Sequence, residues 1–184
     1  LVCVEFGLKE EYIKLAKSQF KFILTDDIKG SLPIRPVQTH KYNAGYVCAL
    51  SGSKGMVGSS WLASKACFRA GAGVVKLFTR KEALLESDFF PELIKSSYED
   101  LSVDVLSKKL NSASSVFIGP GIGLGLNIAK LISELIPKIN VPLVLDADAI
   151  TLYARKPFVL PNNCIMTPHL GELRSLLGDS SIKT

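Results

Sequence analysis

The sequence predicts an α/β domain built around a parallel β-sheet. From residue 45 onward, short apolar segments alternate with segments of helical character, which is the pattern of right-handed βαβ units. Hydrophobic residues make up 47% and charged residues 21% of the 184 residues, which excludes a disordered or fibrous chain. No run of about 18 uncharged apolar residues occurs, so we expect strands buried on both faces and no membrane-spanning helix.

The first 40 residues are heterogeneous, and the regular pattern starts only after them. They contain a predicted strand over 1–6, a predicted amphipathic helix over 8–20 and a Pro-containing connector over 29–40. The chain does not start with methionine, and residues 1–6 lack the basic region and long apolar stretch of a signal peptide. We therefore expect the sequence to be part of a longer protein.

Five apolar strands and five helices are predicted in the regular part of the chain. The strands cover 45–51, 73–79, 114–119, 142–146 and 164–167. The helices cover 59–70, 101–110, 127–136, 147–154 and 171–178. Trp61, Leu62 and Ala66 can share one side of the first helix, Pro137 ends the third, and Gly178 ends the last. The stretch 80–100 is less regular and receives no strand.

Charge and cysteine content restrict the function classes. The 22 Lys and Arg residues exceed the 17 Asp and Glu residues by five, but the cations are scattered and few aromatic residues lie between them. This distribution argues against a nucleic-acid interface. The modest excess of positive charge suits a phosphorylated small molecule. The cysteines Cys3, Cys48, Cys67 and Cys164 form no CxxC pair, so we expect reduced thiols, no zinc site and a cytoplasmic protein.

The residues directly after the predicted strands point to a small-molecule site. In a parallel sheet the carboxyl ends of all strands lie along one edge, where open α/β folds bind their ligands. Small or ionisable residues follow five strands in succession. These residues are Ser51-Gly52-Ser53, Thr79-Arg80, Gly119-Pro120-Gly121, Asp146-Ala147-Asp148 and Thr167-Pro168-His169.

Two of these strand ends are rich in glycine. The loop over 51–58 enters a helix and can either hold an anion or form a tight turn; it matches neither a Walker A loop nor a G-x-G-x-x-G motif. Lys54 in this loop is either solvated or in contact with a phosphate. After the strand over 114–119, Gly119, Gly121 and Gly123 would let a ligand lie against bare backbone, although close strand–helix packing also explains them.

The last two strand ends carry ionisable groups. Asp146 and Asp148 together could hold Mg²⁺ or a sugar hydroxyl, but we favour a polar ligand role for Asp146 and a helix-capping role for Asp148. His169 and Glu172 lie in the segment TPHLGE, where Glu172 suits the first turn of a helix without any catalytic duty. His169 becomes a ligand candidate because it converges with the other strand ends.

Taken in order, these segments resemble the NAD(P)H-hydrate dehydratase family, from about His40 to Gly178. The resemblance rests on SGSKGMVGSSWLASKACFRAGAGVV, FIGPGIG, LVLDADAI and IMTPHLGE. It implies a ribokinase-like, three-layer α/β/α sandwich with a parallel sheet, incomplete at its C-terminus. It also implies a domain over 40–184, preceded over 1–39 by a linker and the end of an epimerase domain.

The resemblance further implies a lyase of metabolite repair. Such an enzyme dehydrates hydrated NADH or NADPH, using ADP or ATP with Mg²⁺, by phosphorylating a hydroxyl and then eliminating it. Matched by motif, Ser59, Gly123 and His169 contact the substrate, and the same crevice is lined by Gly119, Gly121, Asp146 and Glu172. The family also implies a homo-oligomer, while the scattered charge and the lack of a long apolar run lead us to expect no nucleic-acid and no membrane partner.

The sequence departs from the family pattern in two places. The catalytic aspartate of the family lies in a later G-x-G-D segment that has no counterpart in these 184 residues, so no catalytic residue and no metal ligand are assigned. The family's HKGD-x-G segment is HKYNAG over 40–45, without the acidic residue. We therefore expect that this chain by itself can be inactive. The alternatives are a hydroxymethylpyrimidine or sugar kinase of the same fold and a non-catalytic nucleotide-binding module.

Overall fold

In the computed structural model, the structure describes residues 9, 11, 15, 23–30, 32, 36–86 and 90–178. The chain divides into two units, Leu1–Pro36 and Val37–Thr184. The first unit contains the short helix α2 (Thr25–Lys29). The predicted strand over 1–6 and most of the predicted helix over 8–20 lie outside the described residues.

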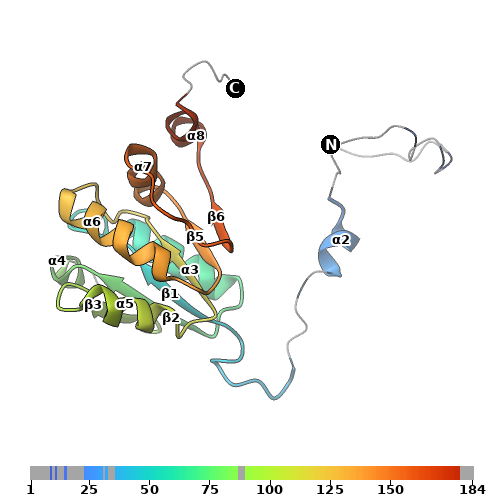
Figure 1. The fold of residues 1–184 in the computed structure, drawn as a ribbon. Coiled ribbons are helices and arrows are strands. Elements are labelled where there is room, and N and C mark those ends of the chain that lie inside the picture. The colour runs from blue at the N-terminus through green and yellow to red at the C-terminus, as the bar shows by residue number, and fades with distance from the viewer. Residues whose placement is uncertain are drawn as a thin grey trace. The chain divides into compact units, whose positions relative to one another are not determined.

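The second unit is built on a six-stranded sheet in which every strand pair is parallel (Figure 1). The strand order across the sheet is β3-β2-β1-β4-β5-β6. The strands are β1 (Tyr46–Leu50), β2 (Val74–Thr79), β3 (Ile94–Ser97), β4 (Ser115–Ile118), β5 (Leu143–Leu145) and β6 (Cys164–Met166). The predicted parallel sheet is therefore confirmed, and its order reverses between β1 and β4.

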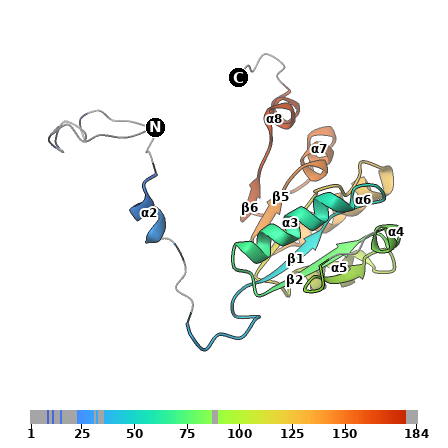
Figure 2. The same cartoon turned by 180° about the vertical axis from the view of Figure 1, so that it is seen from behind.

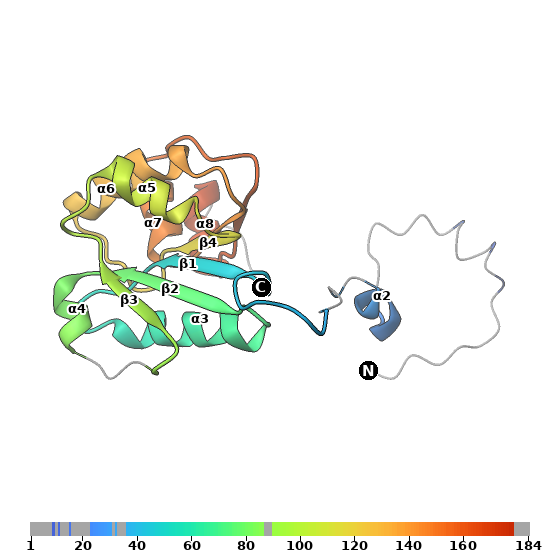
Figure 3. The same ribbon diagram turned by 90° about the horizontal axis from the view of Figure 1, so that it is seen from below.

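Helices cover both faces of the sheet. Those that follow strands are α3 (Val57–Arg69), α4 (Lys81–Leu85), α5 (Val103–Leu110), α6 (Leu126–Leu135), α7 (Asp148–Arg155) and α8 (Leu170–Leu177). Figure 2 shows α3 across one face, and Figure 3 shows α5, α6 and α7 on the opposite side. This arrangement confirms the three-layer sandwich. No described helix is long and apolar enough to cross a membrane.

Two hydrophobic clusters fill the spaces between the layers. Neighbouring strand residues point to opposite faces, and both Ala49 and Leu50 are fully buried. On one face, strand residues pack with helix residues such as Leu106, Ile132 and Ile150. On the other face, Ala49, Leu77 and Phe117 pack with Trp61, Phe68 and Phe90. The central strands are thus buried on both faces, as their apolar sequences predict.

The ten predicted strands and helices of this unit are all present, with bounds within two residues of those predicted. The structure adds β3 and α4 in the stretch 80–100, where no strand was expected. β3 has the sequence IKSS and pairs only with β2 at the edge of the sheet, so it shows no buried apolar run. Pro137 does not end α6 sharply, since it lies within a 3₁₀ turn (Ile136–Lys138) that extends the helix.

Candidate functional site at the carboxyl edge of the sheet

The loops after β1 and β4 meet at the point where the strand order reverses. The Gly52 N–H donates a hydrogen bond to the Pro120 carbonyl oxygen at 2.9 Å. The Ser53 hydroxyl donates to the Gly121 carbonyl oxygen at 2.8 Å. Both glycine-rich segments are therefore held together by direct hydrogen bonds, and they occupy the position where open α/β sheets bind ligands.

Three further strand ends are tied to neighbouring segments. At the last residue of β2, the Thr79 hydroxyl donates to the Gly52 carbonyl oxygen at 3.1 Å. After β5, the Asp148 carboxylate accepts the Gly123 N–H at 2.8 Å. After β6, the Thr167 hydroxyl donates to the Asp146 carboxylate at 2.9 Å. The predicted convergence of five strand ends is thus a continuous row of hydrogen-bonded loops.

Gly119 and Gly121 are required by packing within the protein. Both are buried and have positive φ angles, +132° and +63°. A Cβ atom on Gly119 would collide with the Asp146 carbonyl oxygen, and one on Gly121 would collide with the Ser59 hydroxyl. The close-packing interpretation therefore accounts for these two glycines without a ligand.

Gly123 differs from the other two glycines of this loop. Its φ angle is +93°, but a Cβ atom there would meet only the Ser53 hydroxyl, at 3.9 Å. The Cα side of Gly123 therefore faces open space, while its N–H is engaged by Asp148. This is the position in the loop where a ligand can approach bare backbone.

Ser59 lies in the first turn of α3, next to the β4 loop. Its hydroxyl donates to the Met56 carbonyl oxygen at 2.7 Å, so it helps to close the start of the helix and also packs against Gly121. Lys54 is exposed, which is compatible with both predicted alternatives, a solvated side chain and a phosphate contact.

The turn Asp146-Ala147-Asp148 is strained. Ala147 has φ 50° and ψ −121°, and it is the one residue other than glycine with positive φ in the described part of the chain. It also occupies the N-cap position of α7, with no side-chain cap bond. The expectation that Asp148 caps this helix is therefore wrong: its carboxylate is turned toward Gly123 instead. Such strain persists only where surrounding contacts fix the backbone.

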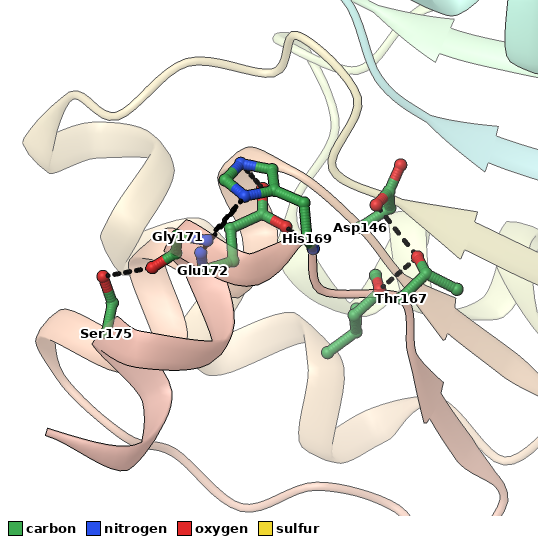
Figure 4. A network of polar contacts seen from close by, with 7 residues as sticks. Asp146, Thr167, His169, Gly171, Glu172 and Ser175 are labelled. Atoms are coloured by element: carbon green, nitrogen blue, oxygen red, sulfur yellow. Dashed lines mark hydrogen bonds and ion pairs between the residues drawn. The ribbon is translucent and has the colours of Figure 1, made fainter. Parts of the chain in front are cut away.

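His169 begins α8 and forms a reciprocal cap with Glu172 (Figure 4). The His169 Nδ1 atom accepts the N–H groups of Gly171 (2.9 Å) and Glu172 (3.4 Å), and the Glu172 carboxylate accepts the His169 N–H at 2.9 Å. Because Nδ1 is an acceptor, the ring proton is assigned to Nε2. The imidazole is 73% exposed and its Nε2 lies 3.4 Å from Glu172, whose side chain is only 12% exposed.

Metal binding has limited support from the described residues. They contain no group of three or more His, Cys, Asp or Glu side chains that could hold a metal ion. Mg²⁺ needs fewer protein ligands when phosphate oxygens and water complete its shell, and one or two carboxylates then suffice. Asp146, directly after β5, and Glu172, in the first turn of α8, are the half-buried carboxylates available for that reduced role, and each already accepts one hydrogen bond.

The profile of the NAD(P)H-hydrate dehydratase family matches residues 47–184. This match extends from the second residue of β1 through α8 and includes every strand-end loop described above. The chain belongs to the NAD(P)H-hydrate dehydratase family. Membership of this family agrees with the resemblance found in the sequence motifs.

Individual relatives of this family member agree with the assignment. The bifunctional NAD(P)H-hydrate repair enzyme of Coxiella burnetii is 33% identical over 181 residues, which are 98% of this chain and 36% of that protein. The ADP-dependent (S)-NAD(P)H-hydrate dehydratase of Staphylococcus aureus is 31% identical over 155 residues, which are 80% of this chain and 54% of that protein. The dehydratase-family chain thus spans between a third and just over half of the length of these relatives.

A solved structure supports the fold of this dehydratase-family chain. A ribokinase-like superfamily protein from Enterococcus faecalis superposes with a TM-score of 0.73 at 26% identity, over 86% of this chain and 59% of that protein. The expected ribokinase-like α/β fold is therefore confirmed.

Four polar residues of the site have roles that the sequence did not assign. Thr79, Ser53, Asp148 and Thr167 each join two loops of the row. Their common signal was available, because each is the last residue of a strand or lies within three residues after one. Which neighbouring loop each of them contacts depends on strand order, which a single sequence does not provide.

Proposed function

We propose that residues 40–184 bind hydrated NADH or NADPH and act in its dehydration, with ADP or ATP as phosphoryl donor. The observation that carries this proposal is the family match over 47–184, which includes the complete row of interlocked loops. The names of the Coxiella and Staphylococcus relatives support the substrate, and the latter name also supports ADP. The family match favours this activity over a pyrimidine or sugar kinase.

We assign the substrate contacts to Ser59, Gly123 and His169. The open Cα side of Gly123 lets a planar ring or ribose approach the backbone. The exposed imidazole of His169 offers its Nε2 proton to a ligand oxygen, since the 3.4 Å separation from Glu172 is a weak contact. Ser59 offers a small side chain at the start of α3, with its hydroxyl already used by Met56.

Gly119, Gly121, Asp146 and Glu172 line the same crevice in this proposal. The two glycines hold the β4 loop against α3 and β5, and Thr167 orients the Asp146 carboxylate. Asp146 and Glu172 would hold Mg²⁺ that arrives with the nucleotide phosphates. Bound Mg²⁺-nucleotide supplies the phosphoryl group that turns the hydroxyl of the hydrate into a leaving group. No residue of this chain is assigned as the base.

We also propose a linker and the end of an epimerase domain over 1–39, a homo-oligomer and a cytoplasmic location. The Coxiella alignment extends over 98% of this chain within a bifunctional enzyme, which supports a linker and the end of an epimerase domain over 1–39. The three described cysteines Cys48, Cys67 and Cys164 are free thiols, in keeping with the cytoplasm. Homo-oligomerisation is expected from the family, and sedimentation equilibrium measures it.

The test combines binding and turnover. Hydrated NADH or NADPH is titrated into the 184-residue chain by calorimetry, with intact NADH as the matched control ligand. The absorbance of the reduced nicotinamide is then followed after addition of Mg²⁺ with ADP or ATP. Preferential binding of the hydrate, with or without nucleotide-dependent recovery of absorbance, supports the binding site; recovery also establishes catalysis. Equal binding of both ligands, or of neither, contradicts the proposal.

A further inference from the structure

A cavity lies at the same sheet edge as the candidate site, at the ends of β2 and β3. It has a volume of about 310 Å³ and is lined by Arg80, Tyr98, Glu99, Leu101, Asn127 and Ile128, among others. Arg80 directly follows Thr79, and Asn127 lies in the first turn of α6, shortly after Gly123. The two chain segments of the candidate site therefore continue directly into the walls of this cavity.

Arg80 is held so that its terminal nitrogens remain available. Its Nε–H donates to the Tyr98 hydroxyl at 3.3 Å, and Tyr98 is only 6% exposed. This hydrogen bond raises the pKa of Arg80, so the guanidinium stays charged. In the described part of the chain this bond uses Nε and leaves the two terminal nitrogens for other partners, and the carboxylates of Glu82 and Glu99 act on the guanidinium charge from nearby. Such a fixed, planar fork is suited to bidentate binding of a phosphate.

The rest of the cavity suits a nucleoside. Leu101, Ile128 and Leu131 form an apolar wall on which a base can lie. One carboxylate oxygen of Glu99 accepts the Lys81 N–H at 2.8 Å, which leaves the other oxygen to accept a ribose hydroxyl. A volume of about 310 Å³ lies at the lower end of the range for small-molecule pockets, so the cavity is large enough for a nucleoside-sized group.

The strand order sets the distance between this cavity and the proposed substrate contacts at Gly123 and His169. The order β3-β2-β1-β4-β5-β6 is the doubly wound arrangement in which dinucleotides lie across the reversal between β1 and β4. The contacts proposed above at Gly123 and His169 follow β4 and β6, whereas Arg80 follows β2. With strands about 4.8 Å apart, the four spacings from β6 to β2 span roughly 19 Å, which is comparable to an extended dinucleotide.

We propose that the cavity at Arg80 binds the adenosine end of the hydrated dinucleotide, and that Arg80 favours the form with a 2′-phosphate. This inference rests on the proposed function. An acidic residue near the end of the second strand accepts the ribose hydroxyl of NAD in doubly wound folds, whereas an arginine nearby accommodates the additional phosphate of NADP. Here the cation is the residue directly after β2.

The test uses two fragments that lack nicotinamide, adenosine 2′,5′-bisphosphate and adenosine 5′-monophosphate. Calorimetry with the 184-residue chain should give an affinity about tenfold or more higher for the bisphosphate, as charged hydrogen bonds provide. Arg80→Gln should abolish this preference. Arg69→Gln, which removes an exposed arginine at the end of α3, should keep it.

Equal affinity of the wild-type chain for both fragments would overturn the proposal, as would a preference that survives Arg80→Gln. If Arg80→Gln does not fold, Arg80→Lys replaces it: lysine keeps the charge without the fork, so part of the preference should be lost, and an unchanged preference would refute the assignment. The outcome is independent of dehydration, because neither fragment can be dehydrated. A chain that prefers the bisphosphate but does not bind hydrated NADPH would refute the proposed function, and with it the hydrated dinucleotide as the ligand, while the assignment of Arg80 to a 2′-phosphate would stand.

Discussion

At the scale of single residues, Asp148 has the clearest structural consequence for the site. Its carboxylate accepts the Gly123 N–H at 2.8 Å, and the preceding Ala147 adopts a strained conformation that directs it there. The same turn presents Asp146 to Thr167. One short turn therefore fixes both the loop after β4 and the segment that leads to His169.

Replacing Asp148 by alanine should release the Gly123 amide. A hydrogen bond to a charged group contributes about 1.5–3 kcal/mol, so exchange of this amide should become roughly ten- to a hundredfold faster. Binding of hydrated NADH should weaken, because the open side of Gly123 is no longer held in place. Hydrogen–deuterium exchange measures the first effect and calorimetry the second.

Two controls separate this effect from general destabilisation. Asp148→Asn retains an acceptor oxygen and should protect the Gly123 amide to an intermediate degree. Asp100→Ala removes an exposed aspartate that pairs with Lys81, and it should leave the amide unchanged. The same Gly123 exchange rate in wild type and Asp148→Ala would rule out the positioning role.

The three glycines of the loop after β4 look alike in the sequence but have different surroundings in the structure. The spacing of Gly119, Gly121 and Gly123 predicted that a ligand lies against bare backbone, with close packing inside the protein as the alternative, and close packing accounts for Gly119 and Gly121. Gly119 and Gly121 approach other parts of the protein, whereas Gly123 faces open space. The sequence contains no information on this difference, because the neighbours come from α3 and β5.

At the scale of secondary structure, the strands that the sequence predicts are those that consist mostly of apolar residues. β4 and β5 are short runs of large apolar residues between polar loops, and both were predicted to within one residue. β3 carries a single apolar residue, Ile94, which is 42% exposed. Its strand conformation comes from pairing with β2, a tertiary contact that overrides the local sequence.

Helix α8 depends on its cap more than the other helices of this unit. It has no fully buried residue, so little core packing compensates for unpaired N–H groups at its start. His169→Ala should therefore cost about 1 kcal/mol of helix stability, and exchange of the α8 amides should rise roughly fivefold. Hydrogen–deuterium exchange across Leu170–Leu177 measures this loss.

His169→Asn distinguishes capping from ligand binding. Asparagine is a good N-cap residue, so this variant should keep the α8 amides protected as in wild type while it removes the imidazole. Binding of hydrated NADH should weaken in both the alanine and the asparagine variants. Wild-type affinity in His169→Asn would mean that His169 has only the structural role of a cap.

At the scale of the whole molecule, the parallel sheet explains both the core and the site. The strands are buried between two hydrophobic clusters, which leaves their carboxyl ends as the places where polar groups gather. The alternation of strands and helices predicted this division from the sequence. The order of the strands, and with it the separation of Arg80 from His169, required the structure.

Burial in these clusters also makes the free energy of unfolding depend on pH. Desolvation raises the pKa of the Cys48 thiol, which is fully buried, and of the Tyr98 hydroxyl. An acid whose pKa is raised by folding keeps its proton in the native state at a pH where the unfolded chain has lost it. The unfolded state then binds fewer protons, so the free energy of unfolding falls as the pH rises.

The free energy of unfolding should begin to fall at about pH 8.5, the ordinary thiol pKa, and should fall further at higher pH. Urea unfolding at a series of pH values measures it as a slope, to which one buried thiol contributes at most about 1.4 kcal/mol per pH unit. Cys48→Ala should be less stable than wild type at neutral pH, because it leaves a small cavity in β1, but its slope should be shallower. Identical slopes for the two proteins would mean that the Cys48 thiol has the same pKa in the folded and unfolded states. That result would contradict the expectation that complete burial in the central strand desolvates the thiolate.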